Sequence, residues 1–313
     1  MFDTKILNFK EIEKEDIQFI NKKYITTGFN NLDKKLFLSK GELVLVASKA
    51  SIGKTSFITQ LCNNQIENNL KVGLYSLDHT KDNIVIKLLA QKCNIPLYNL
   101  MEGDHLNQND LNKLTNAYNS IKNHIVIDST NYTLKDLIAK IKNDSTSNNL
   151  DVVYIDYFQL IKPSLTIENR DMELNEIIKE LKILAKDLNI LIVATSPINK
   201  DLDHREDKRP RLSDLDQLET IEDDANKIIL LHRDDIYKEK EEDLKEKEAF
   251  IKGEQYISKY INKPIVDMEL IIVKNDTGSN DTIKLNFIRN YVSFTDKEAI
   301  KPIMIKRNNE EAK

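Results

Sequence analysis

The fold of this chain is most restricted by one turn, which reads Ala47-Ser48-Lys49-Ala50-Ser51-Ile52-Gly53-Lys54-Thr55. Residues 42–46 form an apolar run of strand length before it, and residues 57–62 carry apolar side chains at helical spacing after it. Where a Gly-Lys-Thr turn joins a strand to a helix, the backbone N–H groups of the turn and the positive end of the helix converge on one point. Together they can hold a phosphate. The alternative is an ordinary strand-to-helix turn with a surface lysine.

Within a phosphate-binding loop, the residues of this turn would have separate roles. Lys54 would reach the outer phosphates of a nucleotide, and the Thr55 hydroxyl would hold a Mg²⁺ ion. The usual pattern opens with glycine where this chain has Ala47, but it keeps Gly53, whose missing side chain lets a phosphate approach closely. The predicted nucleotide contacts are Ala50, Ser51, Ile52, Gly53, Lys54, Thr55 and Ser56.

Two acids follow strand-like runs elsewhere in the chain. Asp156 lies near the end of the apolar run 152–157, where its carboxylate can bind Mg²⁺ directly or through water. Asp78 follows the run 72–77 and is the best-placed candidate for the base that orients an attacking water. An N-cap for the following helix is a second, compatible interpretation of Asp78. The predicted catalytic set is therefore Lys54, Asp78 and Asp156, with Thr55 and Asp156 as Mg²⁺ ligands.

Strand-like and helix-like segments alternate along the chain, which predicts an α/β fold with a mainly parallel twisted sheet and helices on both faces. Residues 267–274 and 282–287 read as a C-terminal antiparallel hairpin with Gly278 at its turn. Residues 143–149 read as a polar loop. The other predicted strands after the first are 72–77, 124–128, 152–157, 190–196 and 227–233, and the main predicted helices are 81–93, 111–121 and 171–188.

The domain organisation follows from shifts in composition. Residues 1–23 are predicted to be either a packed or frayed leader or an arm that docks on a neighbouring subunit. Residues 24–300 form one predicted domain built around the Gly-Lys-Thr turn, and residues 301–313 a flexible tail. Residues 238–263, dominated by Lys and Glu, are predicted to be a solvated helical insertion in that domain.

Composition restricts the class of protein. The net charge of −5, from 46 basic and 51 acidic residues, means that any nucleic acid would be held by a local patch or channel. Cys62 and Cys93 are far apart and lack histidine partners at metal-site spacing, so neither a disulfide framework nor a zinc site is indicated. No apolar run reaches membrane length and the first residues do not begin a signal peptide, so we expect a cytoplasmic protein without a membrane partner.

With these motifs assembled, the chain resembles the C-terminal ATPase domain of DnaB-type replicative DNA helicases, which has a RecA-like fold. The resemblance runs from about Thr26 to Thr295, and the family's N-terminal helical collar domain finds no counterpart in this sequence. The matching segments are Thr27-Gly28-Phe29 with Leu32-Asp33, Ser51-Ile52-Gly53-Lys54-Thr55, Ser76-Leu77-Asp78, Ile155-Asp156-Tyr157-Phe158-Gln159-Leu160, Glu168-Asn169-Arg170, Leu181-Lys182-Ile183-Leu184-Ala185-Lys186, Asp207-Lys208-Arg209-Pro210 with Ser213-Asp214-Leu215, and Ile221-Glu222-Asp223-Asp224-Ala225.

This resemblance implies an ATP- and Mg²⁺-dependent P-loop ATPase that acts as a DNA helicase in replication. The family forms rings, usually hexamers, with ATP between neighbouring subunits and single-stranded DNA in the centre. Lys54, Thr55 and Asp156 carry over directly. The family's hairpin sends a lysine into the neighbour's ATP site, and Lys274 keeps that lysine, which makes it a predicted contact in trans.

Other functional positions depart from the family pattern. Asp78 replaces a catalytic glutamate and draws the carboxylate back by about a bond length, and a misplacement of about 1 Å can cost on the order of a hundredfold in rate. Pro197 replaces a glutamine that senses the γ-phosphate, and Asp276 replaces an arginine finger worth roughly 10³–10⁵ in related chemistry. The family's loop that holds the DNA backbone reads Arg-Glu-Ser-Gly, and this chain has Asp216-Gln217-Leu218-Glu219 there. The negative charge of this loop would repel the phosphates of DNA.

These departures fall on functional positions, whereas the segments that build the fold still match the family. We therefore expect ATP binding and ring assembly to persist while rapid hydrolysis and strand translocation are weakened. A second interpretation is a catalytically impaired nucleotide-binding paralogue that joins a full-length helicase in a mixed ring or regulates it, with the partner supplying the missing arginine. A third, a RecA-like ATPase acting on proteins, is disfavoured by the Asp-Lys-Arg-Pro to Ser-Asp-Leu stretch.

One basic patch is the candidate for contact with DNA. Acidic residues alternate with its basic ones, so a solvated charged loop is the competing interpretation. The acids are Asp201, Asp203, Glu206 and Asp207. The candidate DNA contacts are Lys200, Arg205, Lys208, Arg209 and Arg211.

Overall fold

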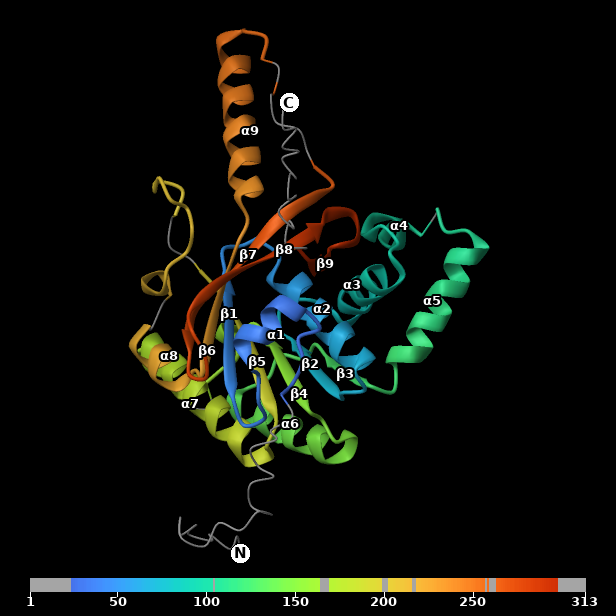
Figure 1. Ribbon diagram of the computed structural model, residues 1–313, viewed down its shortest axis with the longest axis vertical. Coiled ribbons are helices and arrows are strands. Elements are labelled where there is room, and N and C mark those ends of the chain that lie inside the picture. Colours follow the sequence, from blue (N-terminus) through green and yellow to red (C-terminus); the bar gives the residue numbers. More distant parts are fainter. Residues whose placement is uncertain are drawn as a thin grey trace, which may run out of the picture.

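The computed structural model of the protein describes residues 24–103, 105–163, 169–198, 202–215, 218–256, 258 and 263–297. The predicted arm 1–23 and tail 301–313 lie outside this part of the chain, as do Lys200, Asp216 and Gln217. Figure 1 shows one sheet flanked by helices, with α9 (Asp234–Lys252) projecting away from the rest. No helix in these ranges is long and apolar enough to cross a membrane.

Six strands form the parallel part of the sheet: β1 (Leu43–Ser48), β2 (Val72–Ser76), β3 (Ile125–Asp128), β4 (Val152–Asp156), β5 (Leu191–Pro197) and β6 (Lys227–His232). They lie in the order β3-β2-β4-β5-β1-β6, and all pair in parallel. The central strands are buried along almost their whole length, which explains why their sequences are continuous apolar runs. The mainly parallel sheet predicted from the sequence is confirmed.

Both faces of this sheet are covered by helices. The helices α1 (Asn30–Leu36), α2 (Lys54–Glu67) and α3 (Lys81–Cys93) contribute to one hydrophobic core. The helices α6 (Leu134–Asn148), α7 (Arg170–Leu188) and α8 (Leu218–Asp224) line the other face. The α6 and α7 side chains share a second core with β4 and β5. Two further helices, α4 (Leu97–Glu102) and α5 (Gln108–Ile121), follow α3.

The C-terminal part extends the sheet with antiparallel strands. β7 (Ile265–Asn275) pairs with β6 and with β8 (Asp281–Ile288), and β8 pairs with β9 (Ser293–Asp296). The predicted hairpin is confirmed, and its turn falls between Asn275 and Asp281. Strand β9 was not predicted, because it is short and its burial depends on packing against α2.

Two local predictions are corrected. The polar run 143–149 is not a loop, since α6 continues to Asn148 and ends at Asn149 in the left-handed conformation. The charged insertion predicted for 238–263 is helical only as far as Lys252, where α9 ends at Gly253. The chain then turns back along α9, with the Tyr256 hydroxyl donating to Glu242 Oε2 at 2.7 Å. Residues 257 and 259–262 lie outside the described part.

Candidate nucleotide-binding site

A cavity of about 660 Å³ lies where β1, β2, β4 and β5 end at the same edge of the sheet. Parallel strands bring their carboxyl ends together there, and ligands of open α/β sheets bind at this edge. The cavity therefore gathers side chains that are distant in the sequence. Its lining residues are Ala50, Ser51, Gly53, Lys54, Thr55, Ser56, Asp78, His79, Lys87, Asp156, Tyr157, Gln159, Leu160 and Pro197.

The turn between β1 and α2 has the backbone of a phosphate-binding loop. Gly53 has φ of +117° and Ser51 has φ of +64°, and α2 begins directly afterwards at Lys54. A Cβ built on Gly53 would lie 3.7 Å from Met268 Cε, so its backbone conformation rather than crowding within the chain calls for glycine. The Ile52 side chain is buried in the core, so only its backbone can face a ligand.

Thr55 and Asp156, predicted as a pair of metal ligands, are in contact. The Thr55 hydroxyl donates to Asp156 Oδ2 at 2.7 Å. The Thr195 hydroxyl, on β5, donates to Asp156 Oδ1 at 2.5 Å, so both carboxylate oxygens are held. Asp156 is 2% exposed, and its orientation is fixed by residues of two other elements. Thr195 was missed by the sequence analysis because only the strand order places it beside Asp156.

Two lysines carry the positive charge of the cavity. Lys54 Nζ donates to the Ser48 carbonyl oxygen at 3.1 Å. Lys87, on α3, also lines the cavity and was not predicted. Burial lowers the pKa of both lysines below its ordinary value, and the negative charges of Asp156 and Asp78 oppose that shift.

Asp78 lies in the same cavity, with its side chain 48% exposed. It does not cap the next helix. The N-cap of α3 is Thr80, whose hydroxyl accepts from the Asn83 N–H at 3.4 Å. The N-cap interpretation of Asp78 is therefore wrong, and its carboxylate is left facing the cavity beside the two lysines.

The end of β5 brings Pro197 into the cavity wall opposite Ser48. Beside it, Gln159 donates from Nε2 to the Ser196 hydroxyl at 2.6 Å, while its Oε1 is buried without a hydrogen-bond partner. An amide side chain therefore lies beside Ser196, the residue before Pro197. Gln159 was noticed in the sequence only as part of a motif and had no assigned role.

The oxygen donors of this cavity fit a magnesium ion that arrives with a nucleotide. A carboxylate and a hydroxyl are the hard oxygen ligands that Mg²⁺ prefers. Within the described ranges, no three His, Cys, Asp or Glu side chains converge into a cluster that could hold a metal alone. Phosphate oxygens would therefore have to complete the coordination, as they do where Mg²⁺ is bound with nucleotide phosphates.

The residues predicted to act on a neighbouring subunit lie apart from this cavity. Lys274 Nζ donates to the Ala225 carbonyl oxygen at 2.6 Å and also to that of Glu222, at the carboxyl end of α8. Asp276 accepts from Asn226 Nδ2 at 2.9 Å and lies 3.6 Å from Lys274 Nζ. Both hairpin side chains are thus bonded to residues 222–226 of their own chain.

The predicted basic patch is largely ion-paired within the chain. Arg205 pairs with Asp214, Lys208 with Glu241 on α9, and Arg209 makes two hydrogen bonds to Glu269. Arg211 is exposed, and its backbone N–H donates to Asp214. Contact with DNA through Arg205, Lys208 or Arg209 would compete with these internal pairs.

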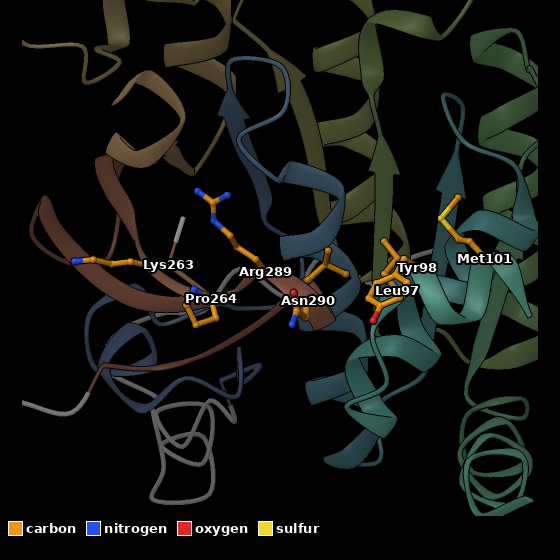
Figure 2. Close-up of a pocket in the computed structure, with 8 residues that line it drawn as sticks. Leu97, Tyr98, Met101, Lys263, Pro264, Arg289 and Asn290 are labelled. Atoms are coloured by element: carbon orange, nitrogen blue, oxygen red, sulfur yellow. The ribbon is translucent and has the colours of Figure 1, made fainter. Parts of the chain in front are cut away.

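A second cavity, of about 510 Å³, lies on a different part of the surface. Figure 2 shows Leu97, Tyr98 and Met101 of the α4 segment on one side and Lys263, Pro264, Arg289 and Asn290 on the other. It contains none of the predicted nucleotide contacts, and its lining is mainly apolar. The phosphate loop, Asp78 and Asp156 line the first cavity and not this second one.

The strand order, the phosphate loop after β1 and the acid at the end of β4 define a RecA-like domain of the P-loop class. A family model described as "DnaB-like helicase C terminal domain" matches residues 24–296. The chain belongs to this family.

Curated relatives agree with this assignment. The replicative DNA helicase DnaB of Geobacillus stearothermophilus is 34% identical over 279 residues, which cover 88% of this chain and 57% of the relative. The DnaB of Haemophilus influenzae is 34% identical over 225 residues, covering 70% of this chain and 48% of the relative. The chain thus spans about half the length of these relatives.

Solved structures give the same fold. A DnaB-like replicative helicase, described with its interactions with primase, matches with a TM-score of 0.76 at 28% identity, over 91% of this chain and 65% of that one. A second solved structure, described as an ATPase domain, matches with the same TM-score and identity, over 91% of this chain and 95% of that one. This second match covers the ATPase domain almost completely.

Proposed function

We propose that this chain binds ATP with Mg²⁺ in the cavity at the ends of β1 and β4, and that it is the ATPase part of a replicative DNA helicase. The observation that carries the proposal is the 2.7 Å hydrogen bond between Thr55 and Asp156, made beside Lys54 in one cavity. A hydroxyl, a buried carboxylate and a lysine at the start of a helix match the needs of a metal-bound triphosphate.

Each residue has a separate role in this proposal. The backbone N–H groups of the loop from Ala50 to Ser56 surround the phosphates, and Lys54 contacts the outer ones. Thr55 and Asp156 hold Mg²⁺, which neutralises charge on the phosphates and fixes their orientation. Asp78, which lines the same cavity, orients the attacking water, and Lys87 adds a second positive charge near it.

We further propose that the protein assembles into a ring, with ATP hydrolysis coupled to movement along single-stranded DNA. In such a ring Lys274 would leave the α8 carbonyls and contact the neighbour's nucleotide. Hydrolysis is expected to be slow, because Pro197 offers no amide and Asp276 offers a negative charge where an arginine would stabilise the transition state. The short Asp78 side chain adds to this loss.

A second candidate function is a catalytically impaired partner in a mixed ring with a full-length helicase. It is favoured by the internal bonds of Asp276, which hold the hairpin tip with a carboxylate at the position of the missing arginine. Such a subunit would still offer its own phosphate loop to a competent neighbour. The two candidates differ in whether the chain hydrolyses ATP by itself.

The decisive assay measures ATP turnover, with and without single-stranded DNA, on a sample whose oligomeric state has been determined. The unmodified chain is compared with the double variant Pro197→Gln, Asp276→Arg. The proposal predicts slow turnover that rises in the double variant. If the unmodified chain unwinds DNA at the rate of an active replicative helicase, the proposed weakening of hydrolysis is wrong. If neither protein hydrolyses ATP alone but a full-length helicase restores turnover, the mixed ring is supported.

A further inference from the structure

We propose that Arg233 is a positioning residue that orients the peptide unit between Ile52 and Gly53 for contact with a triphosphate. This inference rests on the proposed function, because it concerns the same phosphate loop. Arg233 lies directly after β6, and β6 neighbours β1 in the sheet. The side chain therefore reaches the loop from the side opposite β5.

The Arg233 guanidinium donates hydrogen bonds both to the loop and to one acid. Its Nη1 donates to the Ile52 carbonyl oxygen at 3.3 Å. Its Nε and Nη2 donate to the Asp235 carboxylate at 3.1 and 2.5 Å. Arg233 is 4% exposed, so these bonds form away from competing water.

The bond to Ile52 determines which way the next N–H points. The peptide unit between Ile52 and Gly53 is trans, as only the Asp156–Tyr157 bond is cis in the described part of the chain. In a trans peptide the C=O and the following N–H point in opposite directions. With the carbonyl held by Arg233, the Gly53 N–H is turned away from Arg233, toward the cavity that Gly53 lines.

The guanidinium cannot easily turn away from the loop, because a network holds it. Asp235, 9% exposed, also accepts from Arg289 Nη2 at 2.5 Å. The guanidinium carbon of Arg233 lies 4.3 Å from the centre of the Phe287 ring, a cation–π contact. The network joins the start of α9 and the end of β8 to the phosphate loop.

Glycine alone would not fix this peptide unit. Gly53 has φ of +117° and no side chain, so the unit before it can rotate at little steric cost. A rotated unit would present the Ile52 carbonyl oxygen, which carries partial negative charge, to the phosphates. Arg233 excludes that orientation by giving the carbonyl a buried donor.

The test compares variants that change the donor to the Ile52 carbonyl oxygen with a variant that removes a different bond of the network. Arg233→Met with Asp235→Leu removes both charges of the buried pair together, and Arg289, which also binds Asp235, keeps its contact with Glu239 at 3.5 Å. Arg233→Lys keeps one donor. Arg289→Gln, the matched control, removes the other guanidinium bound to Asp235. Affinities for ATP–Mg²⁺ and ADP–Mg²⁺ are measured by calorimetry, and thermal unfolding shows that each variant is folded at the titration temperature.

The proposal predicts that the double variant binds both nucleotides roughly 10- to 100-fold more weakly, the value of one hydrogen bond to a charged group. Arg233→Lys should restore part of the affinity, and Arg289→Gln, which keeps the bond to Ile52, should lose less affinity than the double variant even if its melting temperature falls. Wild-type affinity in the double variant, or an equal loss in Arg289→Gln, would overturn the positioning role while leaving nucleotide binding intact. An unmodified chain that binds no nucleotide would overturn both proposals.

Discussion

The Thr55 hydroxyl donates a 2.7 Å hydrogen bond to Asp156 Oδ2, which joins the start of α2 to the end of β4. Strand β5 lies between β4 and β1, and its Thr195 occupies the other oxygen of the same carboxylate. We predict that Asp156→Asn weakens Mg²⁺-dependent ATP binding by about 10- to 100-fold, the range seen when groups that support a metal are changed. A Mg²⁺ titration at fixed ATP measures this. Unchanged Mg²⁺ dependence would show that Asp156 does not serve the metal.

The lysines of the cavity predict a pH dependence of nucleotide binding. Burial lowers the pKa of Lys54 below its ordinary value of 10.5, so its charge is lost at a lower pH than that of a surface lysine. The neutral form attracts phosphate less, and ATP affinity should therefore fall as the pH rises through this lowered pKa. Lys87→Met should keep the fall, because Lys54 remains, whereas Lys54→Met should bind ATP weakly at every pH. A flat profile for the unmodified chain from about pH 7 to pH 10 would contradict this assignment.

Gly53 and Gly41 form a matched pair for testing the phosphate loop. Their φ angles are +117° and +80°, and neither would place a new Cβ in a clash. Alanine at either position should therefore destabilise the fold by about 1–2 kcal/mol, through backbone strain alone. Only Gly53→Ala should also weaken ATP binding, since Gly41 lies outside the cavity. Equal ATP affinity in the two variants, measured by calorimetry, would place Gly53 outside the binding site.

A change at Arg209 can show whether the basic patch stabilises the fold or binds DNA. Its guanidinium lowers the pKa of Glu269 from 4.5 to about 2, with a smaller contribution from Lys284. Because the pKa is lower in the folded state, this pairing stabilises the fold above about pH 4.5 and loses its effect as the pH falls towards 2.

Arg209→Met should therefore reduce the free energy of unfolding by about 1 kcal/mol at pH 7, since Arg209 is partly exposed. The difference from the unmodified chain should shrink as the pH is lowered below 4.5, and urea unfolding at several pH values measures it. Lys284→Met, which removes the other partner of Glu269, should have a smaller effect in the same direction. If Arg209→Met instead lost affinity for single-stranded DNA at unchanged stability, the residue would belong to a DNA contact.

The parts of the site that are contiguous in sequence could be predicted, whereas the parts joined by the sheet could not. The phosphate loop is a local motif, and Asp156 is the last residue of a strand whose apolar run is unmistakable. Thr195 and Arg233 have no local signal, because their roles arise only from the order of β4, β5, β1 and β6. Lys87 lies on a helix that was predicted correctly, yet nothing in its neighbourhood distinguishes it from a surface lysine.

Residues 143–149, predicted as a loop but mostly helical in the structure, show how tertiary contacts override local preference. The last turns of α6 are rich in Asn, Asp, Ser and Thr, which favour loops because their side chains compete for backbone hydrogen bonds. Here Asp144 is buried and accepts from the Tyr75 hydroxyl and from Lys140 Nζ, both at 2.8 Å. Those bonds hold the helical conformation over a stretch that composition alone assigns to a loop.

The central claim is that Lys54, Thr55 and Asp156 together hold a metal-bound triphosphate. Calorimetric titration of the unmodified chain with ATP in the presence and absence of Mg²⁺, beside Lys54→Ala, tests it most directly. We predict saturable binding to one site per chain that is stronger with Mg²⁺ and is lost in Lys54→Ala. No detectable binding of ATP to the folded, unmodified chain, or equal binding to Lys54→Ala, would contradict the claim.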